Sequence, residues 1–407
     1  MKRIAALLLV ILFIPLCSCS IDFKKLTDGS LFGNKTKPND PFKDKSVDII
    51  PADVTEYLNE LSCYNCLNDG QKKLYAIFLS AIENMELGVI DITEYAGSDG
   101  FSDSVIAHRA LLYDRPDVFW MPKTFSVLSF ADRNDKYVCF KDYYGEDDGI
   151  GYYGITREQR DQMREELDTA VEIILNGAKS YGSAYDKEVY FHDRICETVT
   201  YDSAAAKDID NASRNTVSAY GALVERTALC EGYAKAMQLL CIKSGIPCTV
   251  VNGMHEGVPH MWNLINPGDG LYYLDVTFDD GSSVAILHSY LNVTRSDISD
   301  THIFDCLFEQ GKEYDSSESL NFYAPDCENR SLNYFEKNKA YIDGDCAYAI
   351  LNIERAASKG KNCVELLNKT SLGLTDAFAL LRGKAAGTVV LQEFYRYENT
   401  NTLLIVW

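Results

Sequence analysis

A helical segment followed directly by two alternating segments occupies residues 230–278, and no other part of the sequence limits the local fold as strongly. Apolar residues recur at helical spacing from Cys230 onward, and the later Gly245, followed closely by a proline, is typical of a helix end. Residues 260–265 and 271–278 then alternate in hydrophobicity around a turn that contains Pro and Gly. This order predicts one helix followed by an antiparallel hairpin.

The same segment brings together three side chains that can form a catalytic group. Cys230 would lie at the N-terminus of the helix, where unpaired N–H groups and the helix dipole stabilise a thiolate. If Ile265 pairs with Gly270 around a four-residue loop, His260 stands directly opposite Asp275 on one face of the hairpin. An odd-length loop without a bulge would place the two on opposite faces. Thiol, imidazole and carboxylate in this order predict an activated-cysteine triad.

Three motifs carry a resemblance to a known family. The sequences Ala-Leu-Cys-Glu-Gly-Tyr-Ala around Cys230, His-Met-Trp-Asn from His260 and Tyr-Leu-Asp-Val-Thr-Phe-Asp-Asp around Asp275 resemble the transglutaminase-like superfamily of cysteine enzymes, over about residues 185–305. The resemblance implies a papain-like α+β core, with the cysteine helix packed on an antiparallel sheet. It also implies that Cys230 is the nucleophile, that His260 is the general base and acid, and that Asp275 orients the histidine.

Other residues of the segment are candidates for supporting roles. The backbone N–H of Cys230 could donate to an oxyanion, and Tyr220 is a candidate for the second donor. We expect Trp262 to pack against the hairpin and to keep water off the imidazole, and Asn263 to satisfy backbone groups. Outside the triad, His192 falls on the apolar stripe of a predicted helix and is expected to be a core histidine, whereas we expect two further histidines, His255 and His288, to be surface residues.

The N-terminus predicts export. Residues 1–19 combine a basic start with an apolar run too short to span a bilayer comfortably, which indicates a signal peptide. The run ends in Leu-Cys-Ser-Cys, which resembles the lipobox of bacterial lipoproteins and makes Cys19 the candidate for lipidation; an ordinary signal peptide is the alternative. A lipid on Cys19 would anchor the protein to the membrane of the cell envelope. Residues 20–50 are polar and are expected to form a disordered tether.

Three folded regions are expected beyond the tether. Residues 51–180 predict an α+β region rich in helix, with helical patterns near residues 54–61, 74–85 and 105–113 and a hairpin at 124–141. Residues 181–325 contain the transglutaminase-like motifs. Residues 326–407 predict a small α/β unit, with helices at 346–357 and 374–381, strands at 363–367, 389–396 and 402–407, and no evident chemistry. The acidic residues 143–154 lack the spacing of an EF-hand, so an exposed loop is expected there.

The charge and cysteine content of the sequence argue against a nucleic-acid-binding protein and against a zinc site at Cys63 and Cys66. A net charge of −21 and a sequence pI near 4.7 argue against nucleic acid as a partner, because binding phosphate backbones requires clustered Lys and Arg. Of 13 cysteines, an odd number remain beyond the signal segment, so at least one free thiol is expected. The spacing of Cys63 and Cys66 suits zinc, but no second pair follows nearby, so a helix end or a local disulfide is favoured.

These features support an enzyme that forms a thioester on Cys230. Water as the second substrate would make it a hydrolase of peptide-like amides, which is favoured, and an amine would make it a transglutaminase. A non-catalytic binding or scaffold protein on the same fold is a third alternative. No calcium site of the animal transglutaminase kind is evident, so neither a metal nor another cofactor is expected. The expected partners are a peptide or protein substrate and, through the lipid, a membrane.

Overall fold

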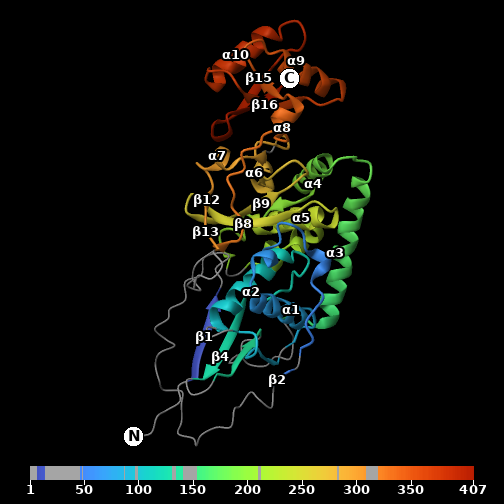
Figure 1. Ribbon diagram of the computed structural model, residues 1–407. Helices are drawn as coiled ribbons and strands as arrows, with labels where there is room; N and C mark the ends of the chain where they lie inside the picture. Colours follow the sequence, from blue (N-terminus) through green and yellow to red (C-terminus); the bar gives the residue numbers. More distant parts are fainter. Residues whose placement is uncertain are drawn as a thin grey trace, which may run out of the picture. The chain divides into compact units, whose positions relative to one another are not determined.

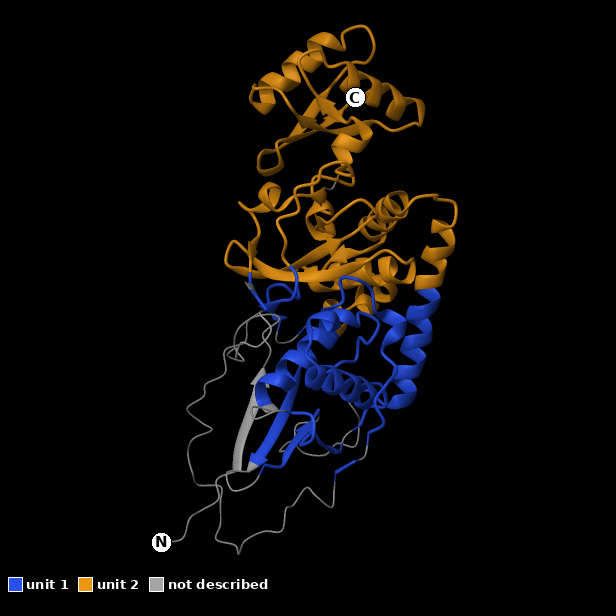
Figure 2. Cartoon of the chain, in the orientation of Figure 1, with its two compact units in different colours: residues 1–170, 204–214, 305–323 blue, residues 171–203, 215–304, 324–407 orange. Residues whose placement is uncertain are grey.

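The computed structural model describes residues 7–13, 46–47, 49–86, 88–96, 100–130, 134–140, 154–209, 212–281, 284–308 and 320–407. The chain divides into two compact units (Figure 2): unit 1 contains residues 1–170, 204–214 and 305–323, and unit 2 contains residues 171–203, 215–304 and 324–407. The regions expected at 181–325 and 326–407 therefore lie mainly together in unit 2. Within the described residues, no helix combines the length and the apolar character needed to cross a membrane.

Unit 1 contains a five-stranded sheet with the strand order β1-β4-β5-β3-β2 (Figure 1). The strands are β1 (Leu7–Phe13), β2 (Ser46–Val47), β3 (Val89–Asp91), β4 (Thr124–Phe130) and β5 (Lys136–Cys139). Strands β4 and β5 pair antiparallel, which confirms the predicted hairpin. Strand β1 lies within the expected signal peptide, and β2, in the expected tether, pairs with β3. Signal cleavage itself stays a prediction, and residues 14–45 lie outside the described part of the chain.

Two helices of unit 1, α1 (Asp69–Glu83) and α2 (Gly100–Asp114), pack against each other and confirm two of the predicted helical segments. Helix α1 begins at a capping box in which Asn68 and Gln71 bond each other's backbone. The helix expected near residues 54–61 is wrong, because only the short turn η3 (Thr55–Tyr57) forms there. Side chains of Asp53, Asn59 and Ser62 accept backbone N–H groups in this segment and compete with helical hydrogen bonds.

None of ten cysteines in the described part of the chain is in a disulfide bond. Cys63 and Cys66 are the two ends of the 3-10 helix η4 (Cys63–Cys66), and both are free thiols, so the alternative of a local disulfide is wrong. Ten cysteines in all are free thiols, and eight of these are buried. The acidic loop expected at 143–154 lies outside the described residues except for Gly154.

Unit 2 is built around helix α5 (Cys230–Lys243), which packs on strands β8 (Cys248–His255) and β9 (Val258–Ile265) (Figure 1). The sheet is antiparallel throughout and has the order β11-β10-β9-β8-β12, with β10 (Tyr272–Leu274), β11 (Leu291–Val293) and β12 (Ile303–Phe304). Every residue of α5 from Cys230 to Cys241 is buried. The mixture of helix and antiparallel sheet confirms the α+β class, and the predicted helix end is confirmed by Gly245, whose φ is +74°.

Two long helices precede α5 in the chain, as predicted: α3 (Arg157–Ala178) and α4 (Ala184–Thr198). Helix α4 packs against α5 and against the short helix α6 (Val276–Asp279). The remaining elements are short. Between α4 and α5 lie β6 (Thr200–Tyr201), η7 (Arg214–Val217), the π-helix η8 (Gly221–Glu225) and β7 (Thr227–Ala228). Helix α7 (Arg295–Ile298) lies between β11 and β12, and β13 (Cys306–Leu307) and β14 (Leu320–Asn321) follow β12.

The C-terminal part of unit 2 has its own sheet, with the strand order β15-β16-β18-β17. Its elements are α8 (Tyr334–Asn338), β15 (Tyr341–Ile342), α9 (Ala347–Ser358), β16 (Cys363–Asn368), α10 (Leu374–Lys384), β17 (Glu393–Tyr397), η9 (Glu398–Thr400) and β18 (Thr402–Val406). These agree with the predicted order, although the expected strand from residue 389 begins only at Glu393. A separate apolar core that includes Ile353, Leu366 and Leu403 holds the part together.

Candidate active site

Cys230 is the first residue of α5, as its position before the helical pattern predicts. Leu229 is the N-cap residue, has an extended backbone and makes no side-chain cap, while its own N–H bonds Thr216 O at 2.7 Å. The side chain of Cys230 therefore lies at the positive end of the helix dipole, where a thiolate is stabilised. Only 9% of Cys230 is exposed, so the thiol is accessible to a reactant but largely shielded from bulk water.

Gly232 allows other backbone segments to lie against the first turn of α5. A Cβ at this position would be 2.7 Å from the Cβ of Ala228 and 2.8 Å from Thr216 O, both closer than side chains tolerate. The glycine of the Cys-Glu-Gly motif is therefore required by packing next to the nucleophile. The adjacent Glu231 is buried and forms an ion pair with Lys235 at 2.9 Å, so its charge has a partner of its own.

His260 connects the thiol to a carboxylate. Its Nε2 lies 2.5 Å from Oδ2 of Asp275, and Cys230 is close enough to contribute to the electrostatics of its ring. Because Nε2 faces the carboxylate, Nδ1 is the nitrogen that remains for the thiol. Burial alone would lower the pKa of His260, but the charge and hydrogen bond of Asp275, helped by Cys230, raise it to about 10. The histidine is therefore held as an imidazolium beside the sulfur.

The imidazole of His260 lies between two aromatic rings. Trp262 stacks at a centroid distance of 5.8 Å and an interplanar angle of 24°, and Phe278 stacks at 4.9 Å and 26°. Trp262 is 1% exposed. Trp262 thus packs against the hairpin residue His260, and its role in keeping water off the imidazole stays a prediction.

Asp275 is fixed by four donors. Its Oδ1 accepts the backbone N–H groups of Thr277 and Phe278 at 2.9 and 3.2 Å, since Asp275 is the N-cap residue of α6. Its Oδ2 is shared between His260 and His302, the latter at 2.9 Å. Burial by itself would raise the pKa of Asp275, but the two histidines hold it below the ordinary range, so the acid stays ionised.

The predicted strand pairing needs a correction. Ile265 pairs with Tyr272 rather than with Gly270, and the second strand ends at Leu274 instead of continuing to Phe278. The register is shifted by two residues, which preserves the faces of the sheet. His260 therefore reaches Asp275 not across a ladder pair but at the point where β10 turns into α6.

His302 is a member of the site that the sequence pattern did not indicate. It is 1% exposed, and its Nδ1 lies 2.8 Å from the hydroxyl of Thr301. We call His260, Asp275 and His302 the triad cluster; it shares two residues with the predicted Cys230–His260–Asp275 triad but contains His302 in place of Cys230. One sequence feature could have indicated that another segment lies here: Gly253 is a glycine inside a strand, which marks a close backbone approach. In the structure a Cβ at Gly253 would clash with the backbone of Ile303. That approach places β12, and His302 just before it, against the catalytic hairpin.

The supporting candidates have different outcomes. Asn263 is fully buried and donates to Ala234 O at 2.9 Å and Thr249 O at 3.4 Å, so it satisfies backbone groups of α5 and β8, as expected, although in mid-strand. Tyr220 is buried at the start of η8, and its role as an oxyanion donor stays a prediction. His255 is half-buried, and its Nδ1 lies 2.9 Å from Thr301 O.

A second group of histidines and carboxylates lies in unit 2. His192, Asp193 and His288, which we call the α4 cluster, join through Oδ1 of Asp193, which lies 3.0 Å from His192 Nδ1 and 2.9 Å from His288 Nε2. His192 is fully buried, which confirms the prediction of a core histidine. The expectation that His288 is a surface residue is wrong: it is 9% exposed, because its ring stacks on Tyr334 at 3.9 Å.

Comparison with known proteins agrees with this geometry. Residues 170–284 match the model of the transglutaminase-like superfamily, so the chain contains a transglutaminase-like domain. No curated protein matches the chain. A solved structure described as "a TGase" is 18% identical, with 48% of this chain and 54% of that chain covered and a TM-score of 0.30. A "Putative Cysteine Protease from Cytophaga hutchinsonii" is 17% identical, with 34% and 41% covered and a TM-score of 0.25. The chain thus spans about half of these structures.

Proposed function

We propose that this transglutaminase-like domain cleaves amide bonds of peptide-like substrates, with Cys230 as nucleophile, His260 as general acid and base, and Asp275 as the orienting residue. The observation that carries the proposal is the position of one imidazole, bonded to a buried carboxylate through Nε2 and close to a thiol at a helix N-terminus. An imidazole in this position can take the proton of the thiol, and the resulting thiolate is the nucleophile in cysteine enzymes.

The chemistry follows from these positions. The thiolate of Cys230 adds to the amide carbonyl, and the backbone N–H at the start of α5, with Tyr220 as the candidate second donor, stabilises the oxyanion. The imidazolium of His260 gives its proton to the departing amine, so the C–N bond breaks and a thioester remains. Neutral His260 then takes a proton from water, which attacks the thioester, releases the acid and restores the thiolate–imidazolium pair.

A second function uses the same intermediate. If an amine replaces water, the thioester is converted into a new amide, and the protein acts as a transglutaminase. Hydrolysis is favoured because no feature of the sequence identifies a site for an acceptor amine. A non-catalytic scaffold is disfavoured by the buried, hydrogen-bonded His260–Asp275 pair beside Cys230, which a binding protein would not need.

We further propose that the protein acts outside the cytoplasm, attached to the membrane of a bacterial cell envelope by a lipid on Cys19. The support is the sequence of residues 1–19, in which a basic start and an apolar run precede Leu-Cys-Ser-Cys. Metabolic labelling with an alkyne fatty acid tests this: label on the wild-type chain and none on Cys19→Ala is expected, and equal labelling would contradict it.

A pulse of iodoacetamide tests the triad directly. We expect full-length protein, treated briefly at pH values from 4 to 8, to be alkylated at Cys230 even at low pH, and the fast reaction to disappear in His260→Ala. Mass spectrometry of the peptides identifies the modified cysteine. Reaction of Cys230 with the ordinary thiol pKa of about 8.5 would contradict the proposal. A screen of peptide amides with and without added amines then separates hydrolysis from transfer.

A further inference from the structure

The α4 cluster contains the donor set of a metal site. His192 Nδ1, Asp193 Oδ1 and His288 Nε2 all lie within 4.8 Å of one another. Two of the three distances between them are 3.0 and 2.9 Å, close to the spacing of ligand atoms around one small cation. Two imidazoles and one carboxylate are a donor set that zinc and other divalent first-row metals accept.

The other nitrogen of each imidazole faces a buried carboxylate. Nε2 of His192 lies 3.1 Å from Oδ2 of Asp279, and Nδ1 of His288 lies 4.0 Å from Oε2 of Glu365. Asp279 is fully buried and Glu365 is 5% exposed. Histidines that bind a metal usually give their second N–H to a carboxylate, which fixes the tautomer and the orientation of the ring. The α4 cluster has this outer layer for His192, whereas the carboxylate of Glu365 lies near His288 Nδ1 without a hydrogen bond to it and accepts the backbone N–H of His288 instead.

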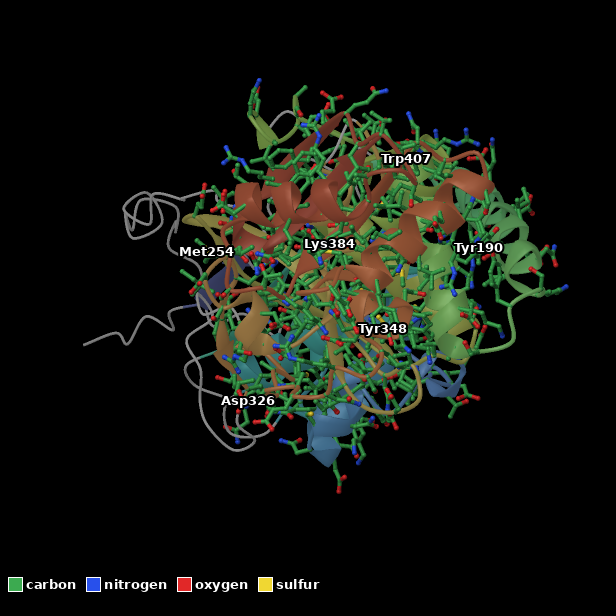
Figure 3. All side chains as sticks on the ribbon, turned by 90° about the horizontal axis from the view of Figure 1, so that it is seen from above. Tyr190, Met254, Asp326, Tyr348, Lys384 and Trp407 are labelled. Carbon is green, nitrogen blue, oxygen red and sulfur yellow. The ribbon has the colours of Figure 1, made fainter. Side chains whose placement is uncertain are left out.

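An ion could reach the α4 cluster through a cavity. Asp193 lines a cavity of about 500 Å³ in unit 2, and its side chain is 36% exposed. The carboxylates of Asp186 and Glu197 also line the cavity, and because Arg194 in the same lining pairs with Glu197 at 2.6 Å, Asp186 and Asp193 are the carboxylates that would attract a cation. Tyr190, labelled on the green ribbon of α4 in Figure 3, belongs to the same wall. A fourth ligand, such as water, could enter from this side.

The triad cluster has the same composition but does not have these properties. The side chains of His260, Asp275 and His302 are 6%, 3% and 0% exposed. In both clusters two imidazoles lie against one carboxylate oxygen, but in the triad cluster the remaining nitrogen of His260, Nδ1, is the one that the proposed chemistry needs for Cys230. Every donor is therefore already used in the proposed chemistry, and the α4 cluster is the better candidate.

We propose that the α4 cluster binds one Zn²⁺ ion, or another divalent first-row cation, through His192 Nδ1, Asp193 and His288 Nε2. The fourth coordination position faces the cavity. The ion links helix α4 to the segment before β11 and, through Glu365, to strand β16 of the C-terminal sheet. The proposal is independent of the proposed amide hydrolysis, because no atom of the catalytic triad is a ligand.

Zinc titration of untagged full-length protein tests the site. The Cys230→Ala background removes the thiol of the triad as a competing ligand. After treatment with a chelator, the protein is titrated with Zn²⁺ against a colorimetric competitor, and Co²⁺ spectra report on the ligand geometry. We expect one equivalent to bind and to raise the Tm. We expect Asp193→Asn and His288→Gln each to weaken binding by about tenfold or more.

A matched control is His255→Gln, which alters a half-buried histidine outside the α4 cluster and should leave zinc affinity unchanged. Circular dichroism of the metal-free variants shows whether they fold. If His288→Gln fails to fold, Asp193→Asn decides, since its side chain is partly exposed. Absence of zinc binding would show that the α4 cluster is a hydrogen-bonded network only. Equal affinity in Asp193→Asn, or loss in His255→Gln instead, would likewise overturn the proposal.

Discussion

The triad cluster and the α4 cluster are each built from two histidines and an aspartate, yet their surroundings differ. Asp275 receives two backbone N–H groups as a helix N-cap, and it is closed off from solvent. Asp193 lies on the solvent side of α4, and its two histidines are backed by further carboxylates. In both clusters two imidazoles lie against one carboxylate oxygen, but the first leaves Nδ1 of His260 for a thiol, whereas the second borders a cavity through Asp193. Backbone and burial, rather than residue type, decide the chemistry.

Removal of the nucleophile should have the largest effect. We expect Cys230→Ala to lower kcat/KM for a peptide amide found in the screen by about 10⁵-fold or more, because no other group can form the thioester. The matched control is Cys363→Ala, which alters a half-buried free thiol in β16 and should leave kcat/KM within about twofold. Substantial turnover by Cys230→Ala would support the scaffold alternative or a different nucleophile.

Loss of charge on the orienting acid should have the next largest effect. Asp275→Asn keeps the size of the side chain but favours the wrong tautomer of His260, so we expect kcat to fall by about 10³-fold. The neighbouring Asp280→Asn removes an acid that bonds only Tyr233 among the contacts described here, and it should change kcat by less than about threefold. Similar losses in both variants would mean that Asp275 acts through stability alone.

His302 should act as a positioning residue with a smaller effect. His302→Ala removes one donor from Oδ2 of Asp275, and loss of one hydrogen bond to a buried carboxylate corresponds to about a tenfold loss in kcat. The pH profile of Cys230 alkylation should shift as well. With one hydrogen bond fewer, Asp275 stabilises the protonated form of His260 to a different extent, which changes the pKa of that histidine. His302→Gln, which can still donate, should restore part of the rate. An unchanged pH profile in His302→Ala would show a purely structural role.

The free energy of unfolding should depend on pH through the paired groups His260 and Asp275, whose pKa values are shifted. The pKa of His260 is raised to about 10, so its stabilising charge is fully present below about pH 6.5 and is lost as the pH rises through about 10. The pKa of Asp275 is lowered, so its contribution is present above about pH 3.9 and is lost on further acidification. The difference in unfolding free energy between wild type and His260→Ala, measured in urea, should therefore be largest between about pH 4 and 6.5. A flat difference from pH 5 to 10 would contradict the shift.

Metal removal should have the smallest effect on catalysis. It should lower the thermal stability that depends on the α4 cluster without changing the reactivity of Cys230. We expect a chelator to leave the rate of Cys230 alkylation within about twofold, since the triad uses no ion, while the Tm falls if the α4 cluster holds one. Alkylation and thermal unfolding of the same chelated sample give both readouts. Loss of alkylation that zinc restores would overturn the expectation of a metal-free triad.

The sequence was sufficient for the parts of the site that local interactions determine. Helix α5 could be located because a periodic apolar pattern ends at Gly245, which has a positive φ. The pairing register could not be predicted, because Asn266 Oδ1 accepts the N–H groups of Gly268 and Gly270 and widens the turn. That choice of turn depends on one side chain, and the Pro–Gly pair alone does not reveal it.

The partners of the site that are distant in sequence could not be predicted. His302 reaches Asp275 from 27 positions away, and no motif surrounds it. His288 was expected at the surface because its own segment is irregular, yet Tyr334 and Glu365 of the C-terminal part cover it. Burial by a distant segment leaves no local signal in the sequence, so only the tertiary structure identifies such residues.

The contacts of Glu365 also bear on whether the C-terminal part is a separable module. Its carboxylate accepts the backbone N–H of His288 at 2.7 Å and the hydroxyl of Ser289, which also lies 2.9 Å from the hydroxyl of Thr402. Truncation at the expected boundary near residue 325 would leave buried donors of the catalytic domain without acceptors, at about 1–3 kcal/mol each. Residues 326–407 are therefore an integral support of the transglutaminase-like domain, and the two parts are expected to be inherited and to unfold together.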